Sequence, residues 1–104
     1  MLAKQRRLAA AEVRHVLARG RSSRAMYISL KHLPGTTSLR AAVVVSKAVA
    51  KKAVVRNRLR RAVYRALMPV AGVGEIVVFV QKIPSPPLTE AFAADLATLL
   101  KKST

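Results

Sequence analysis

The chain has 104 residues, and 20 lysines and arginines stand against four aspartates and glutamates, so the formal net charge at pH 7 is +16. It contains no cysteine, which excludes disulfides, thiol catalysis and cysteine-based zinc sites. The length predicts one domain over residues 1–104, and the hydrophobic share of 52% allows a modest, mainly aliphatic core.

The N-terminal region combines a basic arm with a short helix. We expect residues 1–7 to be mobile and residues 8–19 to form a helix that ends at Gly20. Its apolar face is predicted to consist of Ala9, Val13, Val16 and Leu17. Glu12 and Arg14 interrupt the apolar stretch that a signal peptide would need, so we expect a cytoplasmic protein. No uncharged stretch approaches the ~18 residues of a membrane span, and no membrane partner is expected.

Two strands are predicted next. Residues 25–31 alternate between apolar and polar, which predicts a half-buried strand. Its two sides are Met26, Ile28 and Leu30 toward the core, and Tyr27, Ser29 and Lys31 opposite. Ser22-Ser23 before this strand and HLPGTTS after it (residues 32–38) are predicted to be a loop and a turn, with His32 on the surface. Residues 39–46, LRAAVVVS, are almost continuously apolar, which predicts a strand covered on both faces.

The second half of the chain predicts a helix, a strand and another helix. A small basic connection leads into a helix at about residues 54–68, and residues 75–82, EIVVFVQK, predict a buried strand. Apolar positions then mark a final amphipathic helix: Leu88, Phe92, Leu96, Leu99 and Leu100. The predicted order is α-β-β-α-β-α, and the succession of strand, helix and strand implies a crossover between parallel strands.

Residues 51–65, KKAVVRNRLRRAVYR, hold seven cations and no carboxylate. The apolar residues between the cations have the spacing of one helix face: Val55, Leu59, Ala62, Val63, Ala66 and Leu67. One face is therefore expected to pack on a core while the others carry unpaired positive charge. A helix of this kind needs an anion along its length, and the usual one is a nucleic-acid backbone.

Three other interpretations of the basic helix stay open. A solvated surface helix would normally place glutamates four residues from its cations. A helix lying on a membrane surface would normally carry tryptophan or phenylalanine on its apolar face. A helix that reads DNA base edges would be richer in glutamine, serine and threonine, whereas dense arginine suits phosphates.

Residues 44–67, VVSKAVAKKAVVRNRLRRAVYRAL, resemble the signature of the bacterial ribonuclease P protein subunit. That family has a strand ending in a Ser-Lys element, here Ser46-Lys47, then a short loop and a helix built on Arg-Asn-Arg, here residues 56–58. The resemblance covers nearly the whole chain. It implies a two-layer α/β sandwich similar to ribosomal protein S5 domain 2, with a left-handed crossover through the basic helix.

The resemblance also implies a function. The family removes the 5′ leader of precursor tRNA by endonucleolytic cleavage, and its catalyst is the RNA subunit with bound magnesium. The protein would then be a non-catalytic subunit without a metal or cofactor of its own, and its partners would be ribonuclease P RNA and precursor tRNA. The four acids are few and scattered, and none is expected near the basic helix. The alternative is a general RNA-binding or ribosomal-type protein with no role in processing.

Two sets of contact residues follow from the resemblance. The RNA subunit is expected to contact Lys47, Lys51, Lys52, Arg56, Asn57, Arg58, Arg60, Arg61 and Arg65. The leader cleft, between the first helix and the sheet, is expected to contain Val13, Arg14, Leu17 and Tyr27. The family tends to carry phenylalanines where Val13 and Leu17 stand, so Tyr27 is the one ring predicted there, and an ordinary tyrosine at a strand edge is the alternative.

Overall fold

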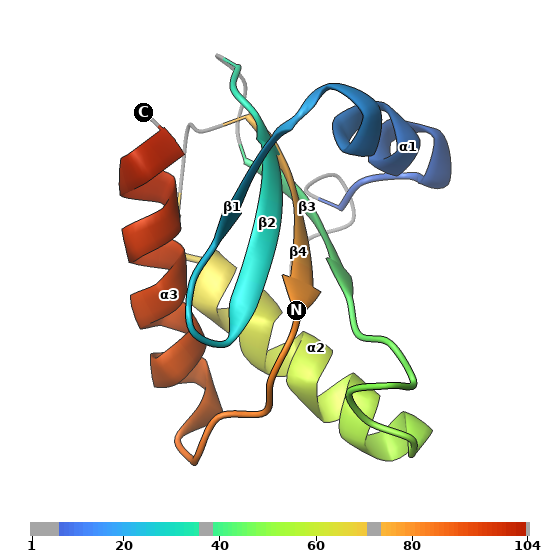
Figure 1. Ribbon diagram of the computed structural model, residues 1–104, viewed down its shortest axis with the longest axis vertical. Helices are drawn as coiled ribbons and strands as arrows, with labels where there is room; N and C mark the ends of the chain where they lie inside the picture. Colours follow the sequence, from blue (N-terminus) through green and yellow to red (C-terminus); the bar gives the residue numbers. More distant parts are fainter. Residues whose placement is uncertain (1–6, 36–38, 71–73, 104) are drawn as a thin grey trace.

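The computed structural model describes residues 7–35, 39–70 and 74–103. Seven elements follow in chain order: α1 (Ala10–Arg19), β1 (Arg21–Arg24), β2 (Ile28–Leu33), β3 (Arg40–Val44), α2 (Ala53–Leu67), β4 (Glu75–Val80) and α3 (Leu88–Ser103) (Figure 1). The predicted basic arm, residues 1–7, lies outside the described residues apart from Arg7.

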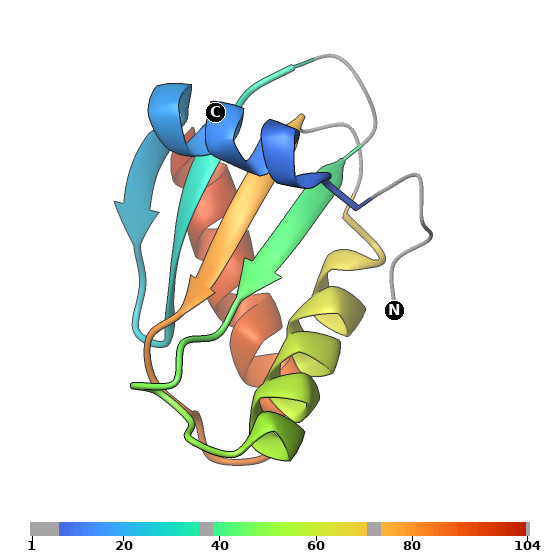
Figure 2. The same cartoon turned by 90° about the vertical axis from the view of Figure 1, so that its right-hand side faces the viewer.

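The strands form one four-stranded sheet in the order β1-β2-β4-β3. β1 pairs with β2 and β2 pairs with β4 in antiparallel fashion, whereas β3 and β4 are parallel. The predicted mixed α/β fold is confirmed, with one strand more than expected. Helices α2 and α3 cover one face of the sheet, and α1 crosses the upper end of the other face (Figure 2).

The connection from β3 through α2 to β4 is left-handed, as predicted. In Figure 2 both strands run downward, α2 returns upward on the far side of the sheet, and β4 lies to the left of β3. A crossover between parallel strands is right-handed in about 98% of cases, so this hand distinguishes the fold from ordinary α/β units. Because α2 runs in the direction opposite to β3 and β4, its N-terminal end lies toward the carboxyl ends of both strands (Figure 2).

The core lies between the sheet and the α2–α3 layer. β2 and β4 send alternate residues into it, including Ile28, Leu30, Ile76 and Val78, each 1% exposed or less. The predicted apolar stripe of α2 is buried at Leu59, Ala62, Val63, Ala66 and Leu67, and Val55 is half-buried. Burying one such aliphatic side chain contributes roughly 1.5–3 kcal/mol, so the shared face of α2 and α3 accounts for much of the stability.

The prediction of a loop at Ser22-Ser23 was wrong, because these residues belong to β1. Ser22 pairs with Lys31 and Ser23 with Leu30 in the antiparallel register. The segment contains no apolar residue, and its strand conformation depends on backbone pairing with β2 instead of on burial.

Two further predictions need correction. His32 was expected on the surface, but the strand continues to Leu33 and His32 is only 2% exposed in the core. Residues 39–46 were expected to be covered on both faces, yet β3 is an edge strand and Val44 is 38% exposed. The reason is that α1 covers only the upper end of its face (Figure 2).

Gly20 ends α1 as predicted, and its N–H donates to the carbonyl oxygen of Val16. Its φ of −71° is open to any residue, so conformational freedom does not explain the glycine. A Cβ atom there would lie 2.6 Å from the Val16 oxygen and 3.3 Å from the backbone nitrogen of His32. The glycine therefore lets the end of α1 approach β2 closely.

Candidate nucleic-acid interface

The sequence of α2 separates a buried stripe from a cationic exterior. The short connection before it turns at Ser46, whose carbonyl oxygen accepts hydrogen bonds from the N–H groups of Val49 and Ala50. Lys47, Lys51 and Lys52 are all exposed in this connection. The lysines therefore continue the positive charge of α2 beyond its first turn.

Arg56 is not simply a surface cation. Its Nη1 donates to the carbonyl oxygens of Ala50 at 2.9 Å and Lys51 at 2.7 Å. The side chain is half-buried, and α2 has neither a side-chain cap nor an acid in its first turn. Arg56 therefore fastens the connection to the helix, a role that the sequence did not reveal.

Asn57 and Arg60 form a pair on the exposed surface of α2. Arg60 Nη1 donates to Asn57 Oδ1 at 2.6 Å, one helical turn away. The hydrogen bond orients both side chains and leaves the amide NH₂ of Asn57 as a donor.

The remaining arginines of α2 border a hollow between this helix and the start of α3. Arg58, Arg61 and Arg65 line its α2 side, and residues 87–90 line the other. Glu90 is among them, so the expectation that no acid lies near the basic helix was wrong. Among the described residues, however, the carboxylates found in ion pairs are Glu12 and Glu75, both with Arg40.

A second hollow lies on the opposite flank of α2. It is lined by Arg7, Asn57, Arg60, Arg61 and Tyr64. Arg61 borders both hollows and therefore stands on the ridge between them. The cations of α2 thus form two basic grooves that share a wall.

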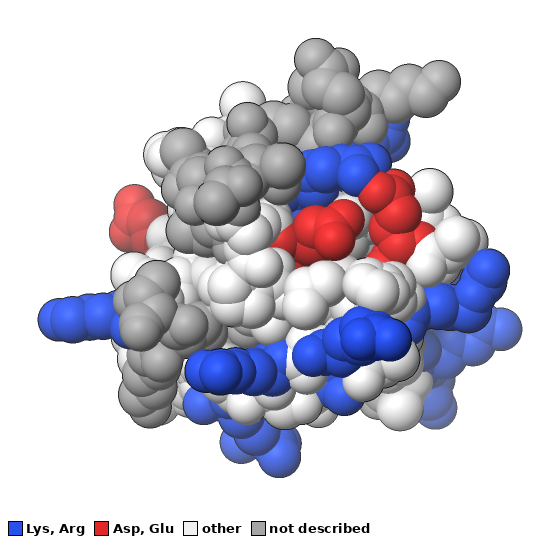
Figure 3. All heavy atoms as spheres, turned by 90° about the horizontal axis from the view of Figure 1, so that it is seen from above, with Lys and Arg blue, Asp and Glu red and all other residues white. Residues whose placement is uncertain are grey.

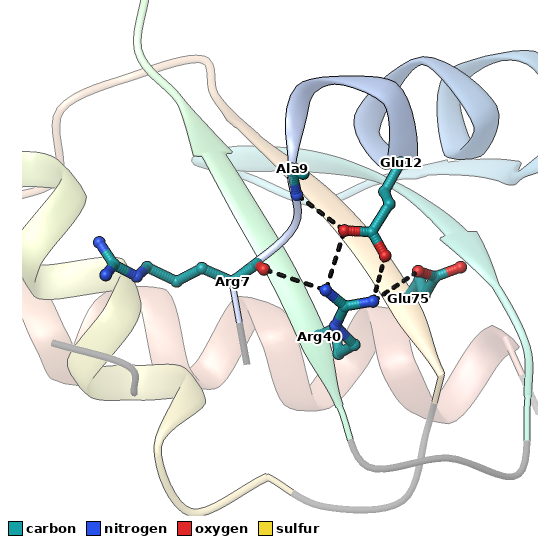
Figure 4. A network of polar contacts seen from close by, with 5 residues as sticks. All are labelled: Arg7, Ala9, Glu12, Arg40 and Glu75. Atoms are coloured by element: carbon teal, nitrogen blue, oxygen red, sulfur yellow. Dashed lines mark hydrogen bonds and ion pairs between the residues drawn. The ribbon is translucent and has the colours of Figure 1, made fainter. Parts of the chain in front are cut away.

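Three charged residues bind α1, β3 and β4 together. Arg40 of β3 donates to both carboxylate oxygens of Glu12 on α1, through Nη2 at 2.8 Å and through Nη1, and lies 3.8 Å from Glu75 Oε2 on β4 (Figure 4). Glu12 Oε1 also accepts from the Ala9 N–H at 2.9 Å, and this bond together with Arg40 lowers the pKa of Glu12 below its ordinary value. In the view from above, acidic side chains lie beside a cation near the middle of the face, while most other cations project outward from its edges (Figure 3).

The structure does not bring the four predicted cleft residues together. Val13 and Leu17 are half-buried and Arg14 is exposed on α1, and the Leu17 carbonyl oxygen accepts a hydrogen bond from Lys31 Nζ at 2.9 Å. Tyr27 lies in the turn between β1 and β2, and this turn is at the end of the sheet away from α1 (Figure 2). Its N–H donates to Asp95 Oδ2 of α3 at 2.7 Å, and the residue packs against the core.

Phe79 is an aromatic residue that the sequence analysis did not single out. It is half-buried on the face of the sheet opposite α2, because it is out of phase with the core residues Ile76, Val78 and Val80. A hollow on this face is lined by Ser22, Ser23, Arg24, Ser29, Leu30, Lys31 and Phe79. The strand alternation in residues 75–80 is the signal that could have identified Phe79 from the sequence.

Neither a metal site nor a membrane-spanning helix is found in the described part of the chain. No three histidine, cysteine or acidic side chains gather closely enough there to hold a metal ion. None of its helices has the length and apolar character needed to cross a bilayer.

Comparison with known proteins identifies the family. The family model of ribonuclease P matches residues 2–103. A protein from Pseudanabaena sp. (strain PCC 6903) named "Ribonuclease P protein component" is 40% identical over 99% of this chain and 95% of its own length. The chain belongs to the ribonuclease P protein family.

Solved structures of ribonuclease P proteins share the fold. A mutant of the Staphylococcus aureus protein matches with a TM-score of 0.78 at 20% identity, over 95% of this chain and 88% of its own. The protein from Thermotoga maritima matches with a TM-score of 0.69 at 23% identity, over 92% and 96% of the two chains. The sheet order and the left-handed crossover therefore belong to a known ribonuclease P protein architecture.

Proposed function

We propose that this chain is the protein subunit of a ribonuclease P ribonucleoprotein, which assists the endonucleolytic removal of the 5′ leader from precursor tRNA. The observation that carries the proposal is the unbalanced cationic exterior of α2 in a chain of this family. Residues 51–65 contain seven arginines and lysines and no carboxylate. Phosphate groups of RNA would supply the missing counter-charge.

The contacts to the RNA subunit are assigned to the basic grooves of α2 and to the connection before it. Phosphates would be bound by Lys47, Lys51, Lys52, Arg58, Arg60, Arg61 and Arg65, with Asn57 as a hydrogen-bond donor. Arg56 acts differently, because its guanidinium already binds two carbonyl oxygens. Its role is to hold the connection and α2 in one rigid surface.

The leader of the precursor tRNA would lie on the opposite face of the sheet. Val13, Arg14 and Leu17 of α1 form one side of this region, and the hollow at Phe79 forms the other. A base can stack on the exposed part of the phenyl ring, while Lys31 and Arg24 neutralise the phosphates. Tyr27 is left out of this assignment because its backbone N–H binds Asp95 of α3 and the residue packs against the core.

The chemistry of cleavage is assigned to the RNA subunit and to magnesium ions bound through it. Metal-assisted phosphodiester cleavage needs carboxylates that converge on one point. In this chain Glu12 and Glu75 bind Arg40, and Asp95 binds the Tyr27 backbone. Glu12 and Glu75 are both engaged by one arginine and Asp95 lies elsewhere, so no three acids gather in the described residues, which supports a non-catalytic role.

The experiment is reconstitution with bacterial ribonuclease P RNA. Addition of the protein should promote cleavage of precursor tRNA at a magnesium concentration where the RNA alone is nearly inactive. A variant with Arg60, Arg61 and Arg65 changed to glutamine should not. If the wild-type protein binds this RNA no better than ribosomal RNA and leaves cleavage unchanged, the general RNA-binding function is correct instead.

A further inference from the structure

Tyr64 is an aromatic residue on a flank of α2 that otherwise carries cations. The residue is half-buried and packs partly against the core. Its remaining surface borders two adjoining hollows. One is lined also by Arg7, Asn57, Arg60 and Arg61, and the other by Arg7, Leu8, Ala9 and Arg40. Packing against the core accounts for only part of this side chain, and the rest of its surface faces arginines.

Arg7 is held beside this ring by its backbone. Arg7 forms a β-bridge with Ala41, and the N–H of Leu8 donates to the Ala41 carbonyl oxygen at 3.0 Å. The Arg7 carbonyl oxygen accepts from Arg40 Nη2 at 3.4 Å. Its side chain points away from the Arg40 network and toward α2 (Figure 4). The guanidinium thus reaches a hollow whose lining includes no carboxylate.

The chemistry of this hollow fits a nucleotide better than an anion alone. Arginines suffice to bind a free phosphate or an acidic peptide, but a planar ring among them adds a surface on which a base can stack. Guanidinium groups also stack on planar rings, so Arg7 can cover the opposite side of a bound base. Arg60 and Arg61 remain for the phosphate, and the Asn57 amide can donate to the base edge or the sugar.

We propose that Tyr64 and Arg7 form a subsite for one unpaired nucleotide of the RNA partner, with the base stacked on the tyrosine ring. This subsite rests on the proposed function, because the nucleotide belongs to the RNA that α2 binds. It assigns to this flank of α2 a non-ionic contact in addition to its phosphate contacts.

The affinity test uses two short RNAs of equal charge. These are an adenylate hexamer and a hexamer with the same backbone but abasic at every position. The wild-type protein should bind the adenylate hexamer more tightly. Tyr64→Leu should weaken that binding by about 5-fold to about 150-fold, the range that corresponds to ~1–3 kcal/mol per stacked base. Binding of the abasic hexamer should not change. Equal affinities of the wild-type protein for the two RNAs, or no effect of Tyr64→Leu, would overturn the subsite.

A matched control separates the ring from its hydroxyl and from packing. Tyr64→Phe keeps the ring, so it should keep the affinity, and a decrease equal to that of Tyr64→Leu would refute stacking. Salt titration adds a second readout: Tyr64→Leu should leave the salt dependence unchanged, whereas Arg60→Gln should flatten it. Thermal unfolding of each variant checks that the fold is intact.

Fluorescence locates the bound base without relying on a variant of Tyr64. The chain has two tyrosines and no tryptophan, so Tyr27→Phe leaves Tyr64 as the only strong emitter. The adenylate hexamer should quench this emission more than the abasic hexamer does, and equal quenching would contradict the proposal. Assembly with ribonuclease P RNA is measured separately. Failure of the wild-type protein to assemble would refute the proposed function, while the hexamers alone decide the subsite.

Discussion

The Arg56 guanidinium donates a hydrogen bond of 2.9 Å to the carbonyl oxygen of Ala50, six residues earlier. A second hydrogen bond of 2.7 Å goes from the same nitrogen to Lys51. The first arginine of the Arg-Asn-Arg element is therefore a structural residue as well as a cation. We expect its substitution to loosen the connection before α2, unlike substitution of the arginines farther along the helix.

We expect Arg56→Ala to lower the free energy of unfolding by about 1–3 kcal/mol, because hydrogen bonds from a charged donor are removed and two carbonyl oxygens are left without that donor. Urea unfolding followed by circular dichroism measures the change. Arg65→Ala is the matched control, since Arg65 is exposed and should change stability by less than about 0.5 kcal/mol. Equal stabilities of the two variants would contradict the structural role of Arg56.

Arg60→Ala, Arg61→Ala and Arg65→Ala together should weaken assembly with ribonuclease P RNA without unfolding the protein. Removing a cation that binds a phosphate should flatten the plot of log affinity against log salt by about one unit per cation. Affinities over a range of salt concentrations provide the slope. Arg19→Ala, which removes an exposed cation at the end of α1, serves as the control for loss of a cation outside α2. If both the affinity and the slope of the triple variant match this control, the RNA surface lies elsewhere.

Phe79→Leu should reduce the preference of the holoenzyme for precursor tRNA over mature tRNA. The loss of one stacked base predicts a decrease of about 5-fold or more. Val13→Phe/Leu17→Phe should increase the preference, because rings would be added at the α1 side of the same region. Tyr27→Phe is the control and should leave the preference unchanged. If neither the Phe79 variant nor the α1 variant changes the preference for precursor tRNA, the leader does not bind this face of the sheet.

The purified protein, free of RNA, should leave precursor tRNA intact in the presence of magnesium, because the two carboxylates that approach each other, Glu12 and Glu75, are both bound by Arg40. Gel analysis of labelled precursor after long incubation tests this. Glu90→Gln removes the acid that borders the basic groove and should not alter the outcome. Metal-dependent cleavage that co-purifies with the protein and disappears in an acid-to-amide variant would show a catalytic site in the chain.

Stability should depend on pH through Glu12. Its pKa is lowered from the ordinary value of 4.5 by the hydrogen bond from Ala9 and by Arg40. A folded-state pKa below the unfolded one means that the stabilisation is present above about pH 4.5 and is lost as pH falls through the lower, folded-state value. The difference in Tm between wild type and Glu12→Gln should therefore shrink from about pH 7 to about pH 3. If the difference in Tm stays constant over this range, protonation of Glu12 is not coupled to unfolding.

The elements that were predictable from sequence are those whose formation buries apolar side chains. The spacing of Leu59 and Val63 located α2, and the apolar run at residues 75–82 located β4. β1 left no such signal, because Arg21–Arg24 contains only polar residues and is held by backbone pairing. The left-handed crossover came from the family resemblance, since no periodicity encodes the hand of a connection.

The site was predictable only in part. The excess of cations on α2 follows from the sequence, and the structure leaves most of them exposed. The inward hydrogen bonds of Arg56 depend on the path of a loop, and sequence spacing does not describe that path. Tyr27 was misplaced because strand alternation was extended too far, into the turn before Ile28. The same alternation, applied to β4, would have directed attention to Phe79.

The pairing of Leu8 with Ala41 has a consequence for the solution behaviour of the protein. β3 is an edge strand, and an edge strand that carries aliphatic side chains is a template for pairing with another chain. The backbone at Arg7 and Leu8 occupies part of this edge. The opposite edge, β1, is only four residues long and has an arginine at each end, which repels a second copy. Trimming the chain back to the start of α1 would uncover the outer edge of β3 and favour aggregation.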